Sequence, residues 1–173
     1  GHVAERPLES EFPSKEKEGV LLRVVASDFI SRIVFDNEET DFLVYMYFPG
    51  RTTDVDDTHA RMRAKFIRLA EFLDAPGSNG SLAVGWMDCA FNVIPHPHGA
   101  HVHHDTIALY AARKKAQPRY WQDLRGGDVE LSELVDFVYG ASENEVTKKH
   151  VRHRAKQLGE RGIRELLPAG LMT

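Results

Sequence analysis

Cysteine is almost absent from this sequence, because only Cys89 among the 173 residues carries a thiol. A single cysteine can form no disulfide within the chain and no cluster of thiolate ligands for zinc. Thiol–disulfide exchange needs one thiolate to attack and a second thiol to resolve the mixed disulfide, so this pair is also missing. Because Cys89 directly follows an apolar segment, we expect it to be a structural, unreactive residue.

Long apolar runs and a strong charge of either sign are missing as well. No run approaches the roughly 18 residues of a membrane span, and a formal net charge of -4 gives no argument for nucleic-acid binding. No apolar leader segment stands near Gly1-His2, which resembles a cloning remnant, so we expect any leader to lie outside this sequence. With 42% hydrophobic and 28% charged residues, the composition predicts one globular domain with extensions.

Short apolar segments alternate with segments of helical periodicity along the middle of the chain. Runs bounded by turn residues predict strands at 19–25, 42–48, 81–87, 106–112 and, at a sheet edge, 118–122. Apolar residues at helical spacing predict helices at 27–36, from the caps at 56–58 to Leu73, and at 130–140. The order β-α-β-α-β, a long connection and then β-β-α predicts an α/β domain with a mixed sheet between helices.

The two ends differ from this middle part in composition. Residues 1–18 are polar, so we expect a disordered or extended arm without a core of its own. Residues 141–173 read as a basic helical extension, with seven Lys and Arg residues between Lys148 and Arg164. Such a charge run is usually a solvated face, but a thin apolar stripe favours docking on this domain or a neighbour; its members are Val146, Val151, Ala155 and Leu158.

Several segments, in the right order, resemble the thioredoxin-like domains of the protein disulfide isomerase family. "DFLVYMYFP" (41–49) is similar to the strand that leads to the family's redox motif, and "MDCAFN" (87–92) to its "VDCTxN" segment. "TIALY" (106–110) is similar to its "PTxxxF" strand, and "PRYWQDLRGGDVELSELVDFV" (118–138) to its ending. The resemblance covers about residues 19–140 and implies a thioredoxin fold for this part of the chain.

The redox motif itself is replaced. The family places Cys-x-x-Cys directly after the strand that ends in Tyr-x-Pro, whereas this chain has Arg51, Thr52, Thr53 and Asp54 there, in a longer loop. The family's cis-proline position falls on Asp105, where a cis peptide bond would cost roughly 2.5–4 kcal/mol, so we expect a trans bond and a remodelled loop. No adjacent base activates the Thr hydroxyls, and Asp54 suits the capping of a helix N-terminus.

The connection before residue 106 is unusually rich in histidine; the imidazoles are those of His96, His98, His101, His103 and His104. Imidazoles with a carboxylate are good ligands for zinc or copper, and the resemblance would bring Asp105 towards Asp54, with His59 nearby. The predicted ligand set is His101, His103, His104 and Asp105. The alternative is a solvated connection whose histidines titrate independently.

Two functions of different classes follow from these observations. The resemblance implies a redox-inactive thioredoxin-like domain that binds protein clients, partner proteins or neighbouring thioredoxin-like domains, in the endoplasmic reticulum lumen or secretory pathway. It implies no cofactor and no catalytic residue. The second hypothesis is a metal-binding domain that uses the cluster from His96 to His104.

Overall fold

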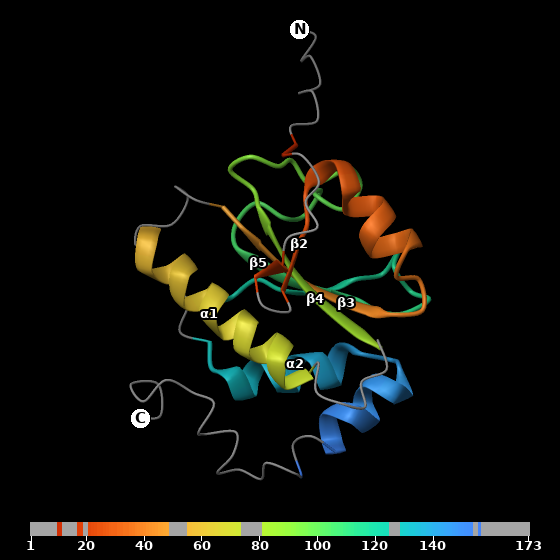
Figure 1. Cartoon of the computed structure of the whole chain (residues 1–173). Coiled ribbons are helices and arrows are strands. Elements are labelled where there is room, and N and C mark those ends of the chain that lie inside the picture. Colours follow the sequence, from red (N-terminus) through yellow and green to blue (C-terminus); the bar gives the residue numbers. More distant parts are fainter. Residues whose placement is uncertain are drawn as a thin grey trace, which may run out of the picture.

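A mixed sheet of six strands lies at the centre of the molecule (Figure 1), in the order β1-β2-β4-β3-β5-β6. The computed structural model describes residues 10–11, 17–18, 21–48, 55–73, 81–124, 129–153 and 156. The strands are β1 (Lys17–Glu18), β2 (Leu21–Arg23), β3 (Asp41–Tyr47), β4 (Leu82–Asp88), β5 (Thr106–Tyr110) and β6 (Arg119–Trp121). Strands β2, β4 and β3 run parallel, and the remaining pairings are antiparallel.

Helices cover both faces of the sheet (Figure 1). They are η1 (Ala26–Asp28), η2 (Ile30–Phe35), α1 (Val55–Leu73) and α2 (Leu131–Ala141), and residues 145–153 are also helical. The predicted order of elements is therefore confirmed, with strand and helix ends shifted by a few residues. Among the described residues, no helix combines the length and the apolar character that crossing a membrane requires.

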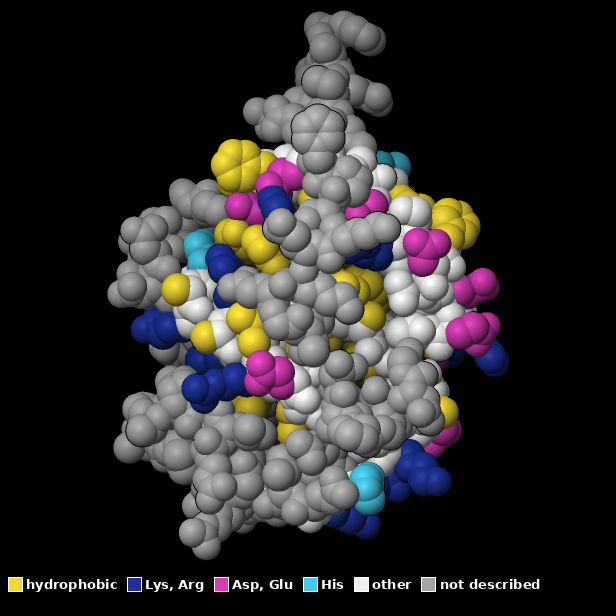
Figure 2. All heavy atoms as spheres, in the orientation of Figure 1, with side chains coloured by type: hydrophobic (Ala, Val, Ile, Leu, Met, Phe, Trp, Pro, Cys, Tyr) yellow, Lys and Arg dark blue, Asp and Glu magenta, His cyan; other side chains and the backbone are white. Residues whose placement is uncertain are grey.

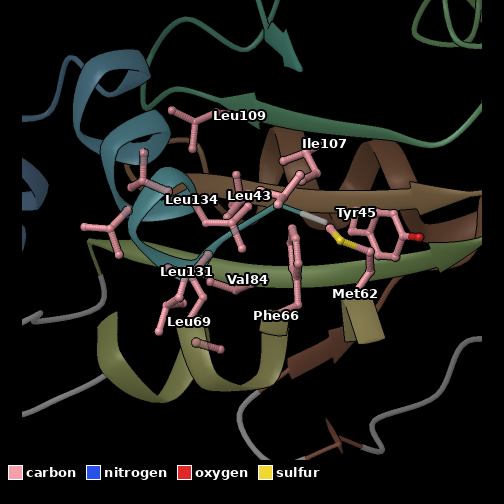
Figure 3. Packing of buried hydrophobic residues seen from close by; sticks show 14 of the residues in the cluster. Leu43, Tyr45, Met62, Phe66, Leu69, Val84, Ile107, Leu109, Leu131 and Leu134 are labelled. Atoms are coloured by element: carbon pink, nitrogen blue, oxygen red, sulfur yellow. The ribbon is translucent and has the colours of Figure 1, made fainter. Parts of the chain in front are cut away.

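Strand β3 separates two hydrophobic cores. Its side chains alternate between the two faces of the sheet, as in any strand, and all of its residues are buried. Leu43, Tyr45 and Tyr47 belong to the first core, which α1 and α2 close. Figure 3 shows Met62 and Phe66 of α1 directed at this face of the sheet. The intervening residues of β3 belong to the second core, on the opposite face; they are Phe42, Val44 and Met46.

The segment predicted as one helix at 27–36 forms a 3-10 turn followed by a π-helix. The Asp28 carboxylate accepts a hydrogen bond from the N–H of Val25, which precedes the turn (2.9 Å). The apolar residues Phe29 and Ile33 of this segment are both fully buried in the second core. The apolar periodicity therefore identified the buried face, although not the helix type.

Both ends of the predicted domain are continuous with further structure. Strand β1 lies within the predicted arm and pairs with β2, and the N–H of Glu11 donates to the side chain of Asn92 (3.0 Å). Beyond α2, the Thr147 hydroxyl donates to the carbonyl of Ser81 (3.2 Å) and Val151 is buried in the first core. The extension thus packs on this domain, but Val146 of the predicted apolar stripe is 48% exposed; Ala155 and Leu158 lie outside the described residues.

A buried polar cluster fastens the start of β3 to its surroundings. Asp41 is completely buried, and its carboxylate accepts hydrogen bonds from the N–H of Ala112 (2.8 Å) and the hydroxyl of Ser142. Lys115 donates to the carbonyls of Thr40 (2.5 Å) and Tyr110 (2.9 Å). Burial lowers the pKa of Lys115 to about 8, although the negative charge of Asp41 acts in the opposite direction.

The close approach of β2 and β4 predicts that Gly85→Ala destabilises the fold by about 1–3 kcal/mol. An added Cβ would lie 2.9 Å from the carbonyl oxygen of Leu22 and 3.1 Å from the ring of Phe42. Gly140→Ala is the matched control, because no atom lies within 4 Å of its Cβ position in α2. Urea unfolding should show little change or a gain of up to about 1 kcal/mol for the control. Equal effects of the two substitutions would contradict this account of Gly85.

The lowered pKa of Lys115 predicts that the fold gains stability from this group as the pH rises. Between its folded pKa of about 8 and its ordinary value of 10.5, the unfolded chain binds more protons than the folded chain. From pH 7.5 to 9.5, the free energy of unfolding of the wild type should therefore rise relative to Lys115→Met by about 1–2 kcal/mol. Lys114→Met, at a side chain that is 55% exposed, is the control. Parallel pH curves for wild type and Lys115→Met would refute the prediction.

Candidate functional site

The carboxyl ends of β3 and β4 meet the start of β5 at one edge of the sheet. Parallel pairing brings Tyr47 beside Asp88, and antiparallel pairing brings Met46 beside Thr106. Ligands of open α/β sheets often bind at such carboxyl ends. We call this edge the sheet corner and define it by Tyr45, Phe48, His59, Cys89 and Asp105. The predicted redox-loop positions Arg51, Thr52, Thr53 and Asp54 follow β3 and lie outside the described residues.

Asp105 holds the sheet corner together. This residue is buried and directly precedes β5. One carboxylate oxygen accepts a hydrogen bond from the N–H of Phe48 (2.8 Å), and the other lies 3.6 Å from Nδ1 of His59. The expected proximity of His59 is thereby confirmed. The cis peptide bond in the described part of the chain precedes Pro97, not Asp105.

His59 and Tyr45 complete a buried polar network with Asp105. The Tyr45 hydroxyl lies 3.1 Å from Nδ1 of His59, whose ring also packs against Tyr47 at 4.7 Å between centroids. Burial, and next the negative charge of Asp105, raise the pKa of Tyr45 far above its usual value of 10. The phenol is therefore neutral at physiological pH and serves as a hydrogen-bonding group, not as a nucleophile. Nε2 of His59 is buried without a hydrogen-bond partner among the described residues.

Cys89 stands at the sheet corner as a lone, half-buried thiol. Its N–H donates to the carbonyl of Tyr47 (2.9 Å), which extends the pairing of β3 and β4 by one residue. Its side chain packs against the second core. The sequence contains no other thiol to resolve a mixed disulfide.

The histidine-rich connection does not gather into one cluster. His101, His103 and His104 are exposed, and Nδ1 of His104 lies 3.2 Å from the backbone oxygen of Asp105. His98 instead packs into the second core, 5.2 Å from the ring of Phe29. Within the described ranges, no group of three His, Cys, Asp or Glu side chains is placed to hold a metal ion. Binding of zinc or copper by His101, His103, His104 and Asp105 stays a prediction.

A groove of about 480 Å³ opens on the side of the second core. It lies between η2, the connection around His98 and the turn from β5 to β6. Its lining residues are mostly apolar or aromatic; they are Ile30, Val34, Pro97, His98, His101, Lys115, Ala116, Gln117, Pro118 and Tyr120. Such a groove is typical of sites that take organic ligands or side chains.

Sequence reasoning located Asp105 and His59 but missed three other features of these sites. Tyr45 was assigned only to a buried strand, because nothing in an apolar run marks the one hydroxyl that meets a histidine 14 positions later. Lys115 is buried, but nothing in the basic stretch "ARKK" (112–115) distinguishes it from its exposed neighbours. The groove is formed by three distant segments, so no local pattern could indicate it.

The exposed apolar residues are dispersed. On the face shown in Figure 2, hydrophobic side chains appear in separate places among charged ones. Two phenylalanines project strongly, since Phe35 is 71% exposed and Phe91 is 62% exposed. Single exposed apolar side chains are normal, and the groove is therefore the better-defined apolar surface.

The network at the sheet corner predicts that Asp105→Ala destabilises the protein by about 1–3 kcal/mol, because the buried N–H of Phe48 loses its acceptor. Asp105→Asn should cost less, since its amide oxygen can still accept that bond. Hydrogen exchange of the Phe48 amide should accelerate in Asp105→Ala. The control, Asp136→Ala on an exposed position of α2, should change stability by less than about 0.5 kcal/mol. Unchanged exchange at Phe48 would contradict the assigned role.

Comparison with solved structures identifies the fold of this chain. No family model and no curated protein sequence matches the chain. Among solved structures, the crystal structure of full-length ERdj5 superposes with a TM-score of 0.50 at 16% sequence identity. The match covers 70% of this chain but only 16% of that one. At this identity the likeness concerns the fold alone, and together with the strand order it confirms that this chain has a thioredoxin-like fold.

Proposed function

We propose that this chain is a redox-inactive thioredoxin-like domain of a protein disulfide isomerase-like protein, and that it acts by binding protein clients or partner proteins. The observation that carries the proposal is the composition of the sheet corner. Where this fold would present two thiols to a substrate, the described residues offer the half-buried Cys89 and the Tyr45–His59–Asp105 network. The sequence supplies no second cysteine.

This network favours a structural role over chemistry. Asp105 is engaged by the N–H of Phe48, and the Tyr45 hydroxyl is neutral and buried. A general base must be within reach of the proton that it abstracts from a substrate, and here the imidazole nitrogen Nδ1 faces Tyr45 and Asp105. The corner thus supports a fixed scaffold, and enzymatic activity is not part of the proposal.

Binding is supported by the groove beside the second core, to which η2 contributes Ile30 and Val34. It is also supported by Phe35, an exposed residue of the same helix. Apolar surface that stays accessible on a well-packed domain is a common feature of protein interaction sites. The partners would be unfolded clients, folded partner proteins or neighbouring thioredoxin-like domains. The resemblance to the isomerase family favours the endoplasmic reticulum lumen or the secretory pathway as the location.

The proposal predicts that the domain binds a permanently unfolded, thiol-blocked protein and does not bind the same protein in its folded form. Fluorescence anisotropy should show saturable binding, because only the unfolded chain exposes apolar segments. In the same preparation, insulin reduction should show negligible turnover, and Cys89→Ser should leave binding unchanged.

Two results would contradict the proposal. Insulin reduction that disappears in Cys89→Ser would indicate a working thiol at the sheet corner. Saturable zinc or copper binding by calorimetry that is lost on replacing His103 and His104, without any client binding, would instead support the metal-binding hypothesis.

A further inference from the structure

The groove beside the second core has a composition that narrows the class of ligand, given the proposed binding of protein clients. Its walls are apolar on two sides. Ile30 and Val34 lie four positions apart on η2, Pro118 directly precedes β6, and Tyr120 belongs to β6. Its volume of about 480 Å³ falls in the range of pockets that hold small organic ligands, so a large apolar side chain fits with part of its neighbour.

The walls are supported from below by packed rings. His98 lies 5.2 Å from Phe29 and 5.5 Å from Tyr110 between ring centroids, and Phe29 contacts Tyr110 edge-on at 5.8 Å. Phe29 and Tyr110 are fully buried. A groove with such a support is largely formed before a ligand arrives, which lowers the entropic cost of binding.

The ionisable side chains that line the groove are basic, apart from the Tyr120 phenol. The described lining residues include Lys115, His98 and His101 but no carboxylate. Burial lowers the pKa of His98, whereas the pKa of Lys115 of about 8 keeps that ammonium protonated at neutral pH. Lys115 donates hydrogen bonds to two backbone carbonyls of described residues. An ammonium group has three N–H donors. Asp41 balances part of this charge from below but does not line the groove.

The basic residues next to Lys115 in the sequence are paired with glutamates, so their charges are largely balanced. Arg113 pairs with Glu39, and Lys114 pairs with Glu143. Both pairs lie at the exposed surface, where the four side chains are more than half accessible. Among the described residues that line the groove, the ammonium group is therefore that of Lys115, which is 6% exposed. None of these described residues carries a carboxylate that would repel an acidic ligand.

We propose that this groove binds a protein segment in which a large apolar side chain is directly followed by Asp or Glu. The apolar side chain occupies the space between η2 and β6, and the carboxylate lies near Lys115. The apolar contact supplies most of the binding free energy, while charge complementarity selects among apolar segments. A neutral or basic apolar segment is the competing occupant.

The first test uses labelled nine-residue peptides that carry Leu-Phe-Asp in a Gly-Ser background. In two variants Asn or Lys replaces the Asp, and in a third Ser-Ser replaces Leu-Phe. Anisotropy should show the tightest binding for the Asp peptide, about fivefold weaker binding for Asn and weaker binding still for Lys. The advantage of Asp over Asn should shrink as salt is raised. Replacing Leu-Phe by Ser-Ser should abolish binding. Equal affinities for Asp, Asn and Lys would overturn the proposal.

The second test alters the groove without removing packing. Ala116 is exposed and lines the groove, so Ala116→Glu adds a carboxylate to the lining, and Ala116→Gln adds the same volume without charge. Ala60→Glu is the matched control, because Ala60 is exposed on α1, which covers the opposite face of the sheet. Ala116→Glu should weaken the Asp peptide about fivefold more than Ala116→Gln, and Ala60→Glu should have no effect, with unchanged melting temperatures for all three.

The outcomes separate this inference from the proposed function. If the unfolded client binds but its affinity is the same in all three variants, the groove assignment is wrong and the binding function stands. If neither the client nor any peptide binds the wild-type domain, both proposals fail.

Discussion

Burial of β3 on both faces is the constraint on which the rest of the structure depends. Every residue of this strand is buried, and it is paired along its length with β4 on one edge and β5 on the other. Because successive side chains point to opposite faces, one strand supplies both hydrophobic cores. Helices α1 and α2 must close one core and η1 and η2 the other, so the position of each covering element follows from this strand. The polar groups at its two ends, Asp41 and the N–H of Phe48, are consequently satisfied by side-chain hydrogen bonds.

The fold was predictable from the sequence because its signals are local. The run 42–48 is apolar on both faces, and the phase of Met62, Phe66 and Leu69 marks the buried face of α1. The π-helix Ile30–Phe35 was not predictable, since a π-helix and an α-helix can bury the same residues. The sheet corner was predictable only in part. A family position identified Asp105, but the partners of Tyr45 and Lys115 depend on contacts between distant segments.

Buried polar side chains connect the end of β3 to the residue that precedes β5 at the sheet corner. A carboxylate at position 105 accepts the N–H that ends β3, and it brings an imidazole and a phenol into the same buried network. Buried polar groups are costly unless they are paired, so such a network favours one arrangement of these three side chains. Nε2 of His59 is an exception, because it is buried without a partner among the described residues. None of the residues that define the sheet corner is among the described residues that line the groove, so its ligand would not depend on the chemistry of this corner.

The outer strands of the sheet are very short, two residues in β1 and three in β6. Long, flat edge strands invite pairing with foreign chains and lead to aggregation, and brief edges are one way in which natural proteins avoid this. A domain with the proposed function would meet unfolded polypeptides and would be exposed to that hazard. With so little free backbone to offer, it would hold a polypeptide mainly through its side chains, which allows release and limits the growth of intermolecular sheets.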